Sequence, residues 1–185
     1  MIPLGLCSVV AIAVLAERLW LYSKVGREQG RVVEEILRVD PPKSEALLPA
    51  CCDSDAPIAR VINAGMAQGN PPSLAAAERQ GADEARRLEG WLPAVDAVVT
   101  LAPLLGLLGT IIGMMQSFKA LDISGSGAPH VVTGGIAQAL TTTAAGLVIA
   151  VVAFAGYSWC RHVMERELHR TEQVVGDVLE RLVSP

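Results

Sequence analysis

Apolar residues fall into three long blocks along this chain, and polar residues fill the segments between them. The first block covers residues 1–22, the second covers residues 92–118 with Asp96 as its one charged residue, and the third covers residues 135–157. A helix that crosses a bilayer needs about 20 apolar residues at a rise of about 1.5 Å each. The pattern therefore predicts three transmembrane helices, at residues 1–22, 93–116 and 135–158.

The polar segments show helical patterns of their own. Residues 26–39 continue the first span, and residues 57–68 and 73–92 form two further helices, the second with Ser73 as its N-cap. The expected organisation beyond the spans is a cytoplasmic helical domain, a short periplasmic loop and a cytoplasmic helical tail, at residues 23–92, 117–134 and 159–185.

One apolar stripe runs along the predicted tail helix. Its members recur at steps of 4, 7, 4 and 3 residues and are Met164, Leu168, Val175, Leu179 and Leu182. An apolar stripe on a helix in water has to be buried against other parts of the protein or another chain. Either the helices of residues 24–92 or a neighbouring copy of the chain supplies this cover.

The composition agrees with a membrane protein and sets its orientation. The chain is 51% hydrophobic and 18% charged, which is too apolar for an ordinary soluble domain. The net charge of −4 gives no indication of nucleic-acid binding. Of the 15 Lys and Arg residues, Lys119 alone falls in the 117–134 loop. The positive-inside rule therefore predicts a periplasmic N-terminus and a cytoplasmic C-terminus.

The first block has two interpretations, a retained helix and a cleaved signal peptide. The Ala11-Ile12-Ala13 sequence resembles a cleavage site, but no Lys or Arg precedes it as a signal peptide requires. A retained helix is therefore favoured. Trp20 and Tyr22 then serve as anchors at the membrane interface.

The four cysteines indicate neither disulfides nor a metal site. Cys7 falls in a span, and Cys51, Cys52 and Cys160 fall on the predicted cytoplasmic side, where thiols stay reduced. The adjacent pair lacks the C-x-x-C spacing of zinc and redox sites. We expect no metal and no cofactor.

Glycine and threonine recur along one side of the second predicted span. At about 100° per residue, Gly106 and Gly113 share the side of Thr110, and Asp96 lies about 40° away and roughly 21 Å toward the inner surface. Gly109 and Gly113 form a G-x-x-x-G pair, which lets another helix approach closely. Since lipid requires neither residue type, this face indicates helix packing or a polar path.

Thr143 marks a similar face on the third span. Ala139 and Gly146 lie on its side, whereas Thr141 and Thr142 point elsewhere. Gln138 lies about 140° from Thr143, so we expect it to bond across a helix–helix contact. The two faces together predict a polar lining made of Thr110, Thr143, Gly106, Gly113, Ala139 and Gly146.

No titratable residue lies near the middle of either span. A threonine hydroxyl hydrates a path or hydrogen-bonds a carboxylate, but it does not titrate at neutral pH. An ion path here therefore requires an acid from another chain. Asp96 is either an inner exit group or a solvated helix-end charge, and we take His130 as a solvated loop residue. Each threonine has the alternative of bonding its own helix backbone.

The two motif segments also resemble a known signature. Residues 102–115 (APLLGLLGTIIGMM) and 134–147 (GGIAQALTTTAAGL) resemble the MotA/TolQ/ExbB proton-channel family, and residues 17–20 (ERLW) resemble the close of the first span in ExbB-like members. The resemblance covers essentially the whole chain. It implies an all-α membrane protein that forms a homopentamer of three-span subunits around a central pore. Thr110 and Thr143 match the pore threonines of the family.

The same resemblance implies the partners and the location. Two copies of a single-span ExbD- or TolR-like protein, each with a membrane aspartate, lie in the pore, and proton flow moves them to energise a TonB- or TolA-like effector. This implies the bacterial inner membrane. Three spans favour the ExbB/TolQ branch over the four-span flagellar stators. One departure is Gln138, which occupies a position where the family commonly has glutamate.

Three functional hypotheses follow. The first is a proton-driven motor subunit, a transport protein and not an enzyme. The alternative is a structural membrane scaffold whose glycines only pack helices and which has no ion pathway. An intramembrane enzyme lacks support, because the spans contain no Ser/His pair, no H-E-x-x-H motif and no paired aspartates.

Overall fold

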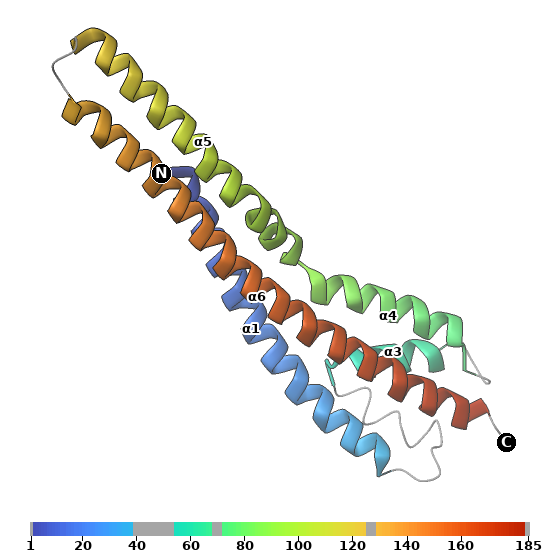
Figure 1. Ribbon diagram of the computed structural model, residues 1–185. Helices are drawn as coiled ribbons and strands as arrows, with labels where there is room; N and C mark the ends of the chain where they lie inside the picture. The colour runs from blue at the N-terminus through green and yellow to red at the C-terminus, as the bar shows by residue number, and fades with distance from the viewer. Residues whose placement is uncertain (1, 39–53, 68–71, 125–128, 184–185) are drawn as a thin grey trace. The chain divides into compact units, whose positions relative to one another are not determined.

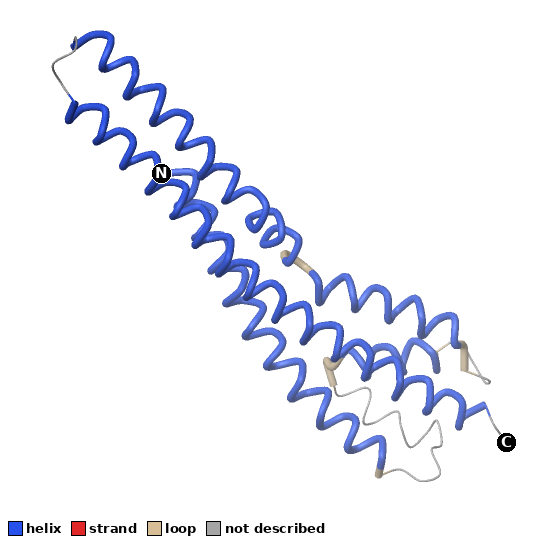
Figure 2. Tube along the Cα trace, in the orientation of Figure 1, coloured by secondary structure: helices blue, strands red, loops and turns tan. Residues whose placement is uncertain are grey.

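The computed structural model describes residues 2–38, 54–67, 72–124 and 129–183. Helices account for nearly all of these residues, and none of them adopts β structure (Figures 1 and 2). The all-α prediction is confirmed for these ranges. The helices are α1 (Ile2–Leu37), α3 (Pro57–Met66), α4 (Leu74–Glu89), α5 (Leu92–Ser124) and α6 (Pro129–Val183).

Three of the helices, α1, α5 and α6, are long and apolar enough to cross a membrane. Large apolar side chains are exposed along all three, for example Leu6 at 66%, Met115 at 67% and Val151 at 67%. Exposure of this kind is costly in water and favourable in lipid or against a neighbouring protein. The prediction of three membrane-capable helices is confirmed.

The helices extend beyond the predicted spans. α1 continues through the polar residues after the first apolar block, and α6 continues through the tail, both as the periodicity predicted. α5 runs to Ser124 and α6 begins at Pro129, so helical backbone enters the segment expected as a loop. The Cys51-Cys52 pair and the His130 side chain lie outside the described part of the chain.

The chain divides into two compact units, which are described separately. The first comprises Met1–Ala16 and Trp91–Trp159, with all of α5 and parts of α1 and α6. Small and β-branched side chains fill its core, and short side chains let helices approach closely. The buried core residues are Leu4, Ala11, Val95, Val98, Ala102, Ala150 and Ala153.

The second unit comprises Glu17–Gly90 and Cys160–Pro185. Its core joins α1, α3, α4 and α6, and it includes Val175 and Leu179 from the predicted apolar stripe of the tail. Of the two covers expected for that stripe, helices from residues 24–92 therefore supply this part. Ser73 caps α4 as predicted, since its hydroxyl oxygen accepts from the backbone N–H of Ala76 at 3.3 Å.

The carboxyl end of α4 is held by two side chains of α1. The buried Arg18 guanidinium donates to the carbonyl oxygen of Leu88 at 3.2 Å, and the Tyr22 hydroxyl donates to the same oxygen at 3.0 Å. Helix ends leave such carbonyls without partners, and a cation there also favours the helix dipole. Tyr22 is only 4% exposed, so its expected role as an interfacial anchor is wrong. Trp20 is 68% exposed.

Candidate functional site

Helices α5 and α6 pack through small residues at very short range. A Cβ atom built on Gly146 would lie 2.6 Å from the carbonyl oxygen of Ala102, and one on Gly106 would lie 3.1 Å from the Cα of Thr143. The first distance is shorter than real Cβ contacts, and the second is tighter than most of them. Glycine at these two positions is therefore what permits the separation of the helices.

The contact continues toward the far end of both helices. A Cβ on Gly109 would lie 2.6 Å from the Thr142 hydroxyl oxygen, and one on Gly113 would lie 2.9 Å from the Cβ of Ala139. Ser117 is buried, donates to the carbonyl oxygen of Gly113 at 2.9 Å, and occupies the space beside Gly135. The small-residue faces of the two helices thus meet each other over several turns.

One threonine hydroxyl joins the two helices directly. Thr143 on α6 donates to the carbonyl oxygen of Gly106 on α5 at 3.0 Å. The hydroxyls of Thr110, Thr141 and Thr142 instead donate within their own helices, to Leu107, Ala137 and Ala139 at 2.6, 2.8 and 2.7 Å. The predicted alternative, a bond to the own helix backbone, thus applies to Thr110 but not to Thr143.

Thr110 and Thr143 are half-buried, and their hydroxyl groups can still form further hydrogen bonds. A hydroxyl that donates one bond still has lone pairs with which to accept others. Such an oxygen can accept from water or from a protonated carboxylic acid. Rotation of the hydroxyl away from the backbone also lets it donate to a carboxylate. The arrangement can therefore solvate either form of an acid without titrating itself.

The structure brings most of the predicted site residues together. Gly106, Gly113, Ala139 and Gly146, expected to line a path, lie in the α5–α6 contact, and so does Gly109, expected to pack helices. Thr110 lies one turn from Gly106 and is half-buried. The side chains of Asp96 and Gln138 are exposed. The pore-lining and packing roles assigned from the sequence stay predictions.

Sequence reasoning missed two polar residues of this contact. Thr142 was expected to point away from it, but its side chain is 7% exposed and packs over Gly109. Ser117 was not singled out. Its spacing of four residues from Gly113 places both on one helix face, and this signal was available.

The site has no groups for charge or metal chemistry of its own. Residues 97–118 and 131–160 contain no Asp, Glu, His, Lys or Arg. Among the described residues, no group of three or more His, Cys, Asp or Glu side chains is placed to hold a metal ion. What the contact offers is a set of hydroxyl and backbone oxygen atoms in an apolar surrounding.

The chain also matches a known protein family. The family described as the MotA/TolQ/ExbB proton channel family matches residues 53–173. The matched region includes the α5–α6 contact, both candidate threonines, and helices α3 and α4 of the second unit.

Relatives match between half and nearly all of the chain. A putative biopolymer transport protein ExbB-like 3 of Synechocystis is 30% identical over 185 residues, which is 96% of this chain and 87% of that protein. The biopolymer transport protein exbB1 of Vibrio cholerae is 30% identical and covers 95% and 81% of the two chains. The Tol-Pal system protein TolQ of Pseudomonas aeruginosa is 36% identical over 50% of this chain and 37% of its own.

Proposed function

This chain belongs to the MotA/TolQ/ExbB proton channel family, and we propose that it is the three-span subunit of an ExbB/TolQ-type motor of the bacterial inner membrane. Five copies surround a central pore. The pore holds a single-span ExbD- or TolR-like partner whose membrane aspartate carries the proton. The proton motive force moves this partner and energises a TonB- or TolA-like effector.

The hydroxyls of Thr110 and Thr143 define the proposed proton path. Both belong to α5 and α6, which have no titratable residue near the middle of their apolar segments, so the proton carrier has to come from another chain. Gly106, Gly113, Ala139 and Gly146 contribute by bringing the two threonine-bearing backbones together. Asp96 is the proposed inner exit group. The N-terminus faces the periplasm and the C-terminus the cytoplasm, as the distribution of Lys and Arg favours.

The chemical step proposed for the threonines is hydrogen-bond exchange. A protonated aspartic acid of the partner donates to a threonine oxygen, and this oxygen keeps its own bond to a backbone carbonyl. When the acid loses its proton, the hydroxyl rotates and donates to the carboxylate. An unpaired carboxylate in an apolar surrounding is costly, so this donor lowers the free energy of the ionised state. One charge crossing 100 mV releases about 2.3 kcal/mol to drive the movement.

The observation that supports this function most strongly is the inter-helix bond from Thr143 to Gly106 beside a second half-buried hydroxyl at Thr110. The test replaces each hydroxyl by a methyl group, in Thr110→Val and Thr143→Val. Proton uptake is measured in vesicles in which the chain and its ExbD/TolR-like partner are reconstituted together. Thr141→Val is the matched control, because that exposed hydroxyl bonds only its own helix.

The motor hypothesis expects proton uptake to fall at least tenfold in Thr110→Val and Thr143→Val, with assembly in the membrane unchanged, and to stay normal in Thr141→Val. Normal uptake in both test variants contradicts it. The scaffold alternative is favoured by the extent of the glycine contact. It expects both threonine variants to be silent and Gly109→Leu to disrupt assembly.

A further inference from the structure

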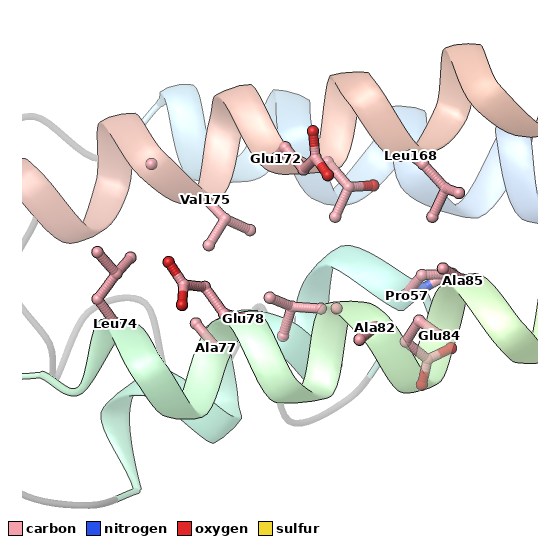
Figure 3. A pocket seen from close by; sticks show the side chains of 14 residues that line it. Pro57, Leu74, Ala77, Glu78, Ala82, Glu84, Ala85, Leu168, Glu172 and Val175 are labelled. Carbon is pink, nitrogen blue, oxygen red and sulfur yellow. The ribbon is translucent and has the colours of Figure 1, made fainter.

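A groove runs between α4 and the tail of α6 in the second unit, with α3 beneath it (Figure 3). Its volume is about 450 Å³. The floor consists largely of small residues, including Ala77 and Ala82, and a Cβ atom added at Gly81 or Gly176 would meet nothing within 4 Å. The groove is thus open and apolar at its base.

The charged side chains that line the groove are all acidic. Glu78, Glu84 and Glu172 belong to the lining, and no Lys or Arg does. Glu84 is neutralised by Arg60, whose Nε lies 2.7 Å from its carboxylate. Within the described ranges, Glu78 has no ion-pair partner, and Glu172 has only His169 at 3.7 Å, which pairs ionically when protonated. Two carboxylates, one from each wall, are therefore available (Figure 3).

A basic face of α1 provides the matching charge. Lys24, Arg27 and Arg31 follow one another along this face, with Glu28 among them. Lys24 pairs with Glu28 at 3.7 Å. In the part of the chain that the structure describes, neither Arg27 nor Arg31 has an ion-pair partner, and both are exposed. Two guanidinium groups thus remain available here, as two carboxylates do in the groove.

The two surfaces lie at the same level along the helices of this unit. The Tyr22 hydroxyl bonds the carbonyl of Leu88, which aligns α1 with the antiparallel α4. At about 1.5 Å per residue, Arg31 lies about 14 Å from Tyr22 along α1, and Glu78 lies about 15 Å from Leu88 along α4. Both lie in the same direction, because the two helices are antiparallel. The bond from Gln29 to Thr171 at 2.9 Å brings Arg31 level with Glu172 in the same way.

The two surfaces also lie on different sides of the unit. α1 packs its buried residues Val32, Val33 and Ile36 into the core that α6 shares. In Figure 3 the pale blue ribbon of α1 runs behind α6, on the side away from the groove. One copy therefore cannot place its own arginines in its own groove, whereas a second copy can.

We propose that the α4–α6 groove is the docking site for the Arg27–Arg31 face of α1 from a second copy of this chain. The inference rests on the proposed function, which requires a ring of copies. Copies inserted in one bilayer share one depth, so a basic face and an acidic groove at equal depth meet. Because the two patches differ, the contact is heterologous, and its repetition gives a ring when the rotation between copies closes. The aliphatic stems of the arginines cover the apolar floor, and the guanidinium groups bond Glu78 and Glu172.

Charge reversal tests this contact in the full chain in detergent. The first variant is Arg27→Glu with Arg31→Glu, the second is Glu78→Arg with Glu172→Arg, and the third combines all four changes. The matched control reverses two exposed charges of α1 outside both patches, in Glu34→Arg with Glu35→Arg. Native mass spectrometry measures the assembled fraction, and circular dichroism confirms that each variant retains its helix content and melting temperature.

We expect the assembled fraction to fall at least tenfold in either double variant and to recover in the fourfold variant, with the control unchanged. Folded double variants that assemble normally overturn the inference, and so does a folded fourfold variant that stays dissociated. Normal assembly would indicate instead that the groove binds a basic segment of another protein and that the arginines bind anionic lipid.

Cross-linking gives a second readout that does not depend on stability. Arg31→Cys and Glu172→Cys are made singly in a chain whose natural cysteines are replaced by serine. A heterologous contact gives no disulfide in either single variant, a dimer when the two are mixed, and a ladder when both are in one chain. A dimer of Arg31→Cys alone, or no product from the mixture, overturns the inference. Loss of proton uptake in Thr110→Val bears only on the proposed function, because it leaves these cross-links unchanged.

Discussion

The Thr143 hydroxyl on α6 and the Gly106 carbonyl oxygen on α5 are 3.0 Å apart and hydrogen-bonded. Gly106 lies four residues, or about one turn, before Thr110. The bond therefore places the second candidate threonine about one turn from the first. It also fixes the rotation of the two helices against each other, because the donor lies within a contact where the glycines hold the two backbones in close contact.

The Thr143 hydroxyl should contribute measurably to stability. Thr143→Val keeps the side-chain shape but removes the donor, and a bond between membrane helices is worth about 0.6 kcal/mol on average. We expect Thr143→Ser, which keeps the hydroxyl, to retain the free energy of unfolding better than Thr143→Val. Unfolding titrations with SDS in mixed micelles measure this. Equal values for the two variants would show that the bond does not stabilise the contact.

Gly146 should tolerate no side chain at all. The Cβ of Gly146→Ala would lie 2.6 Å from the Ala102 carbonyl oxygen, so the two backbones have to separate. Overpacking of this kind costs about 1–3 kcal/mol. Gly134→Ala is the control on the same helix, since nothing lies within 4 Å of its added methyl group. The same SDS titration compares them, and equal stability would contradict the close approach.

Arg18 should stabilise the second unit through the end of α4. Arg18→Met keeps the side-chain length but leaves the Leu88 carbonyl with one donor fewer, and we expect a loss of about 1–3 kcal/mol. Gly90→Ala should also destabilise, because Gly90 has a φ of +45° and its Cβ would overlap the Arg18 guanidinium. Thermal unfolding followed by circular dichroism measures both. Arg87→Met is the control, because Arg87 is exposed. If Arg18→Met has the same melting temperature as Arg87→Met, the capping role of Arg18 is refuted.

The buried bond from Gln29 to Thr171 should behave as a coupled pair. The Gln29 amide donates to the Thr171 hydroxyl oxygen at 2.9 Å, and Gln29 is 2% exposed. Thr171→Val leaves a buried donor without its partner, at a cost of about 1–3 kcal/mol. Adding Gln29→Leu removes that donor, so the double variant should be more stable than Thr171→Val alone. A double-mutant cycle by chemical denaturation tests this, and strictly additive losses would exclude the coupling.

Local sequence signals located most elements of the fold. The lengths of the three apolar blocks predicted membrane-capable α1, α5 and α6, because crossing a bilayer depends on apolar length alone. Ser73 predicted the start of α4, because an N-cap bonds a backbone group within three residues. The ends of α5 and α6 were less predictable. Their helical backbone continues past the apolar blocks, since polar residues also propagate a helix.

The candidate site was only partly predictable for a geometric reason. Helical periodicity gives the face on which a residue lies, but it does not give the neighbour of that face. The sequence therefore grouped Gly106 and Gly113 with Thr110 without showing that these glycines contact α6 of the same chain. The sequence also predicted that Thr142 points away from this contact, whereas the structure buries Thr142 there.

The sequence by itself determined that this protein has three membrane-length helices, with small-residue faces on two of them and no acid near the middle of those two. Each is a property of composition and spacing within one segment. Only the tertiary structure decided that Thr143 bonds Gly106 and that Tyr22 and Arg18 bond the carboxyl end of α4. It also decided that the exposed Arg27 and Arg31 lie on a different surface of the second unit from Glu78 and Glu172. These three hydrogen bonds join residues 37 to 70 positions apart, and no local periodicity specifies such pairs.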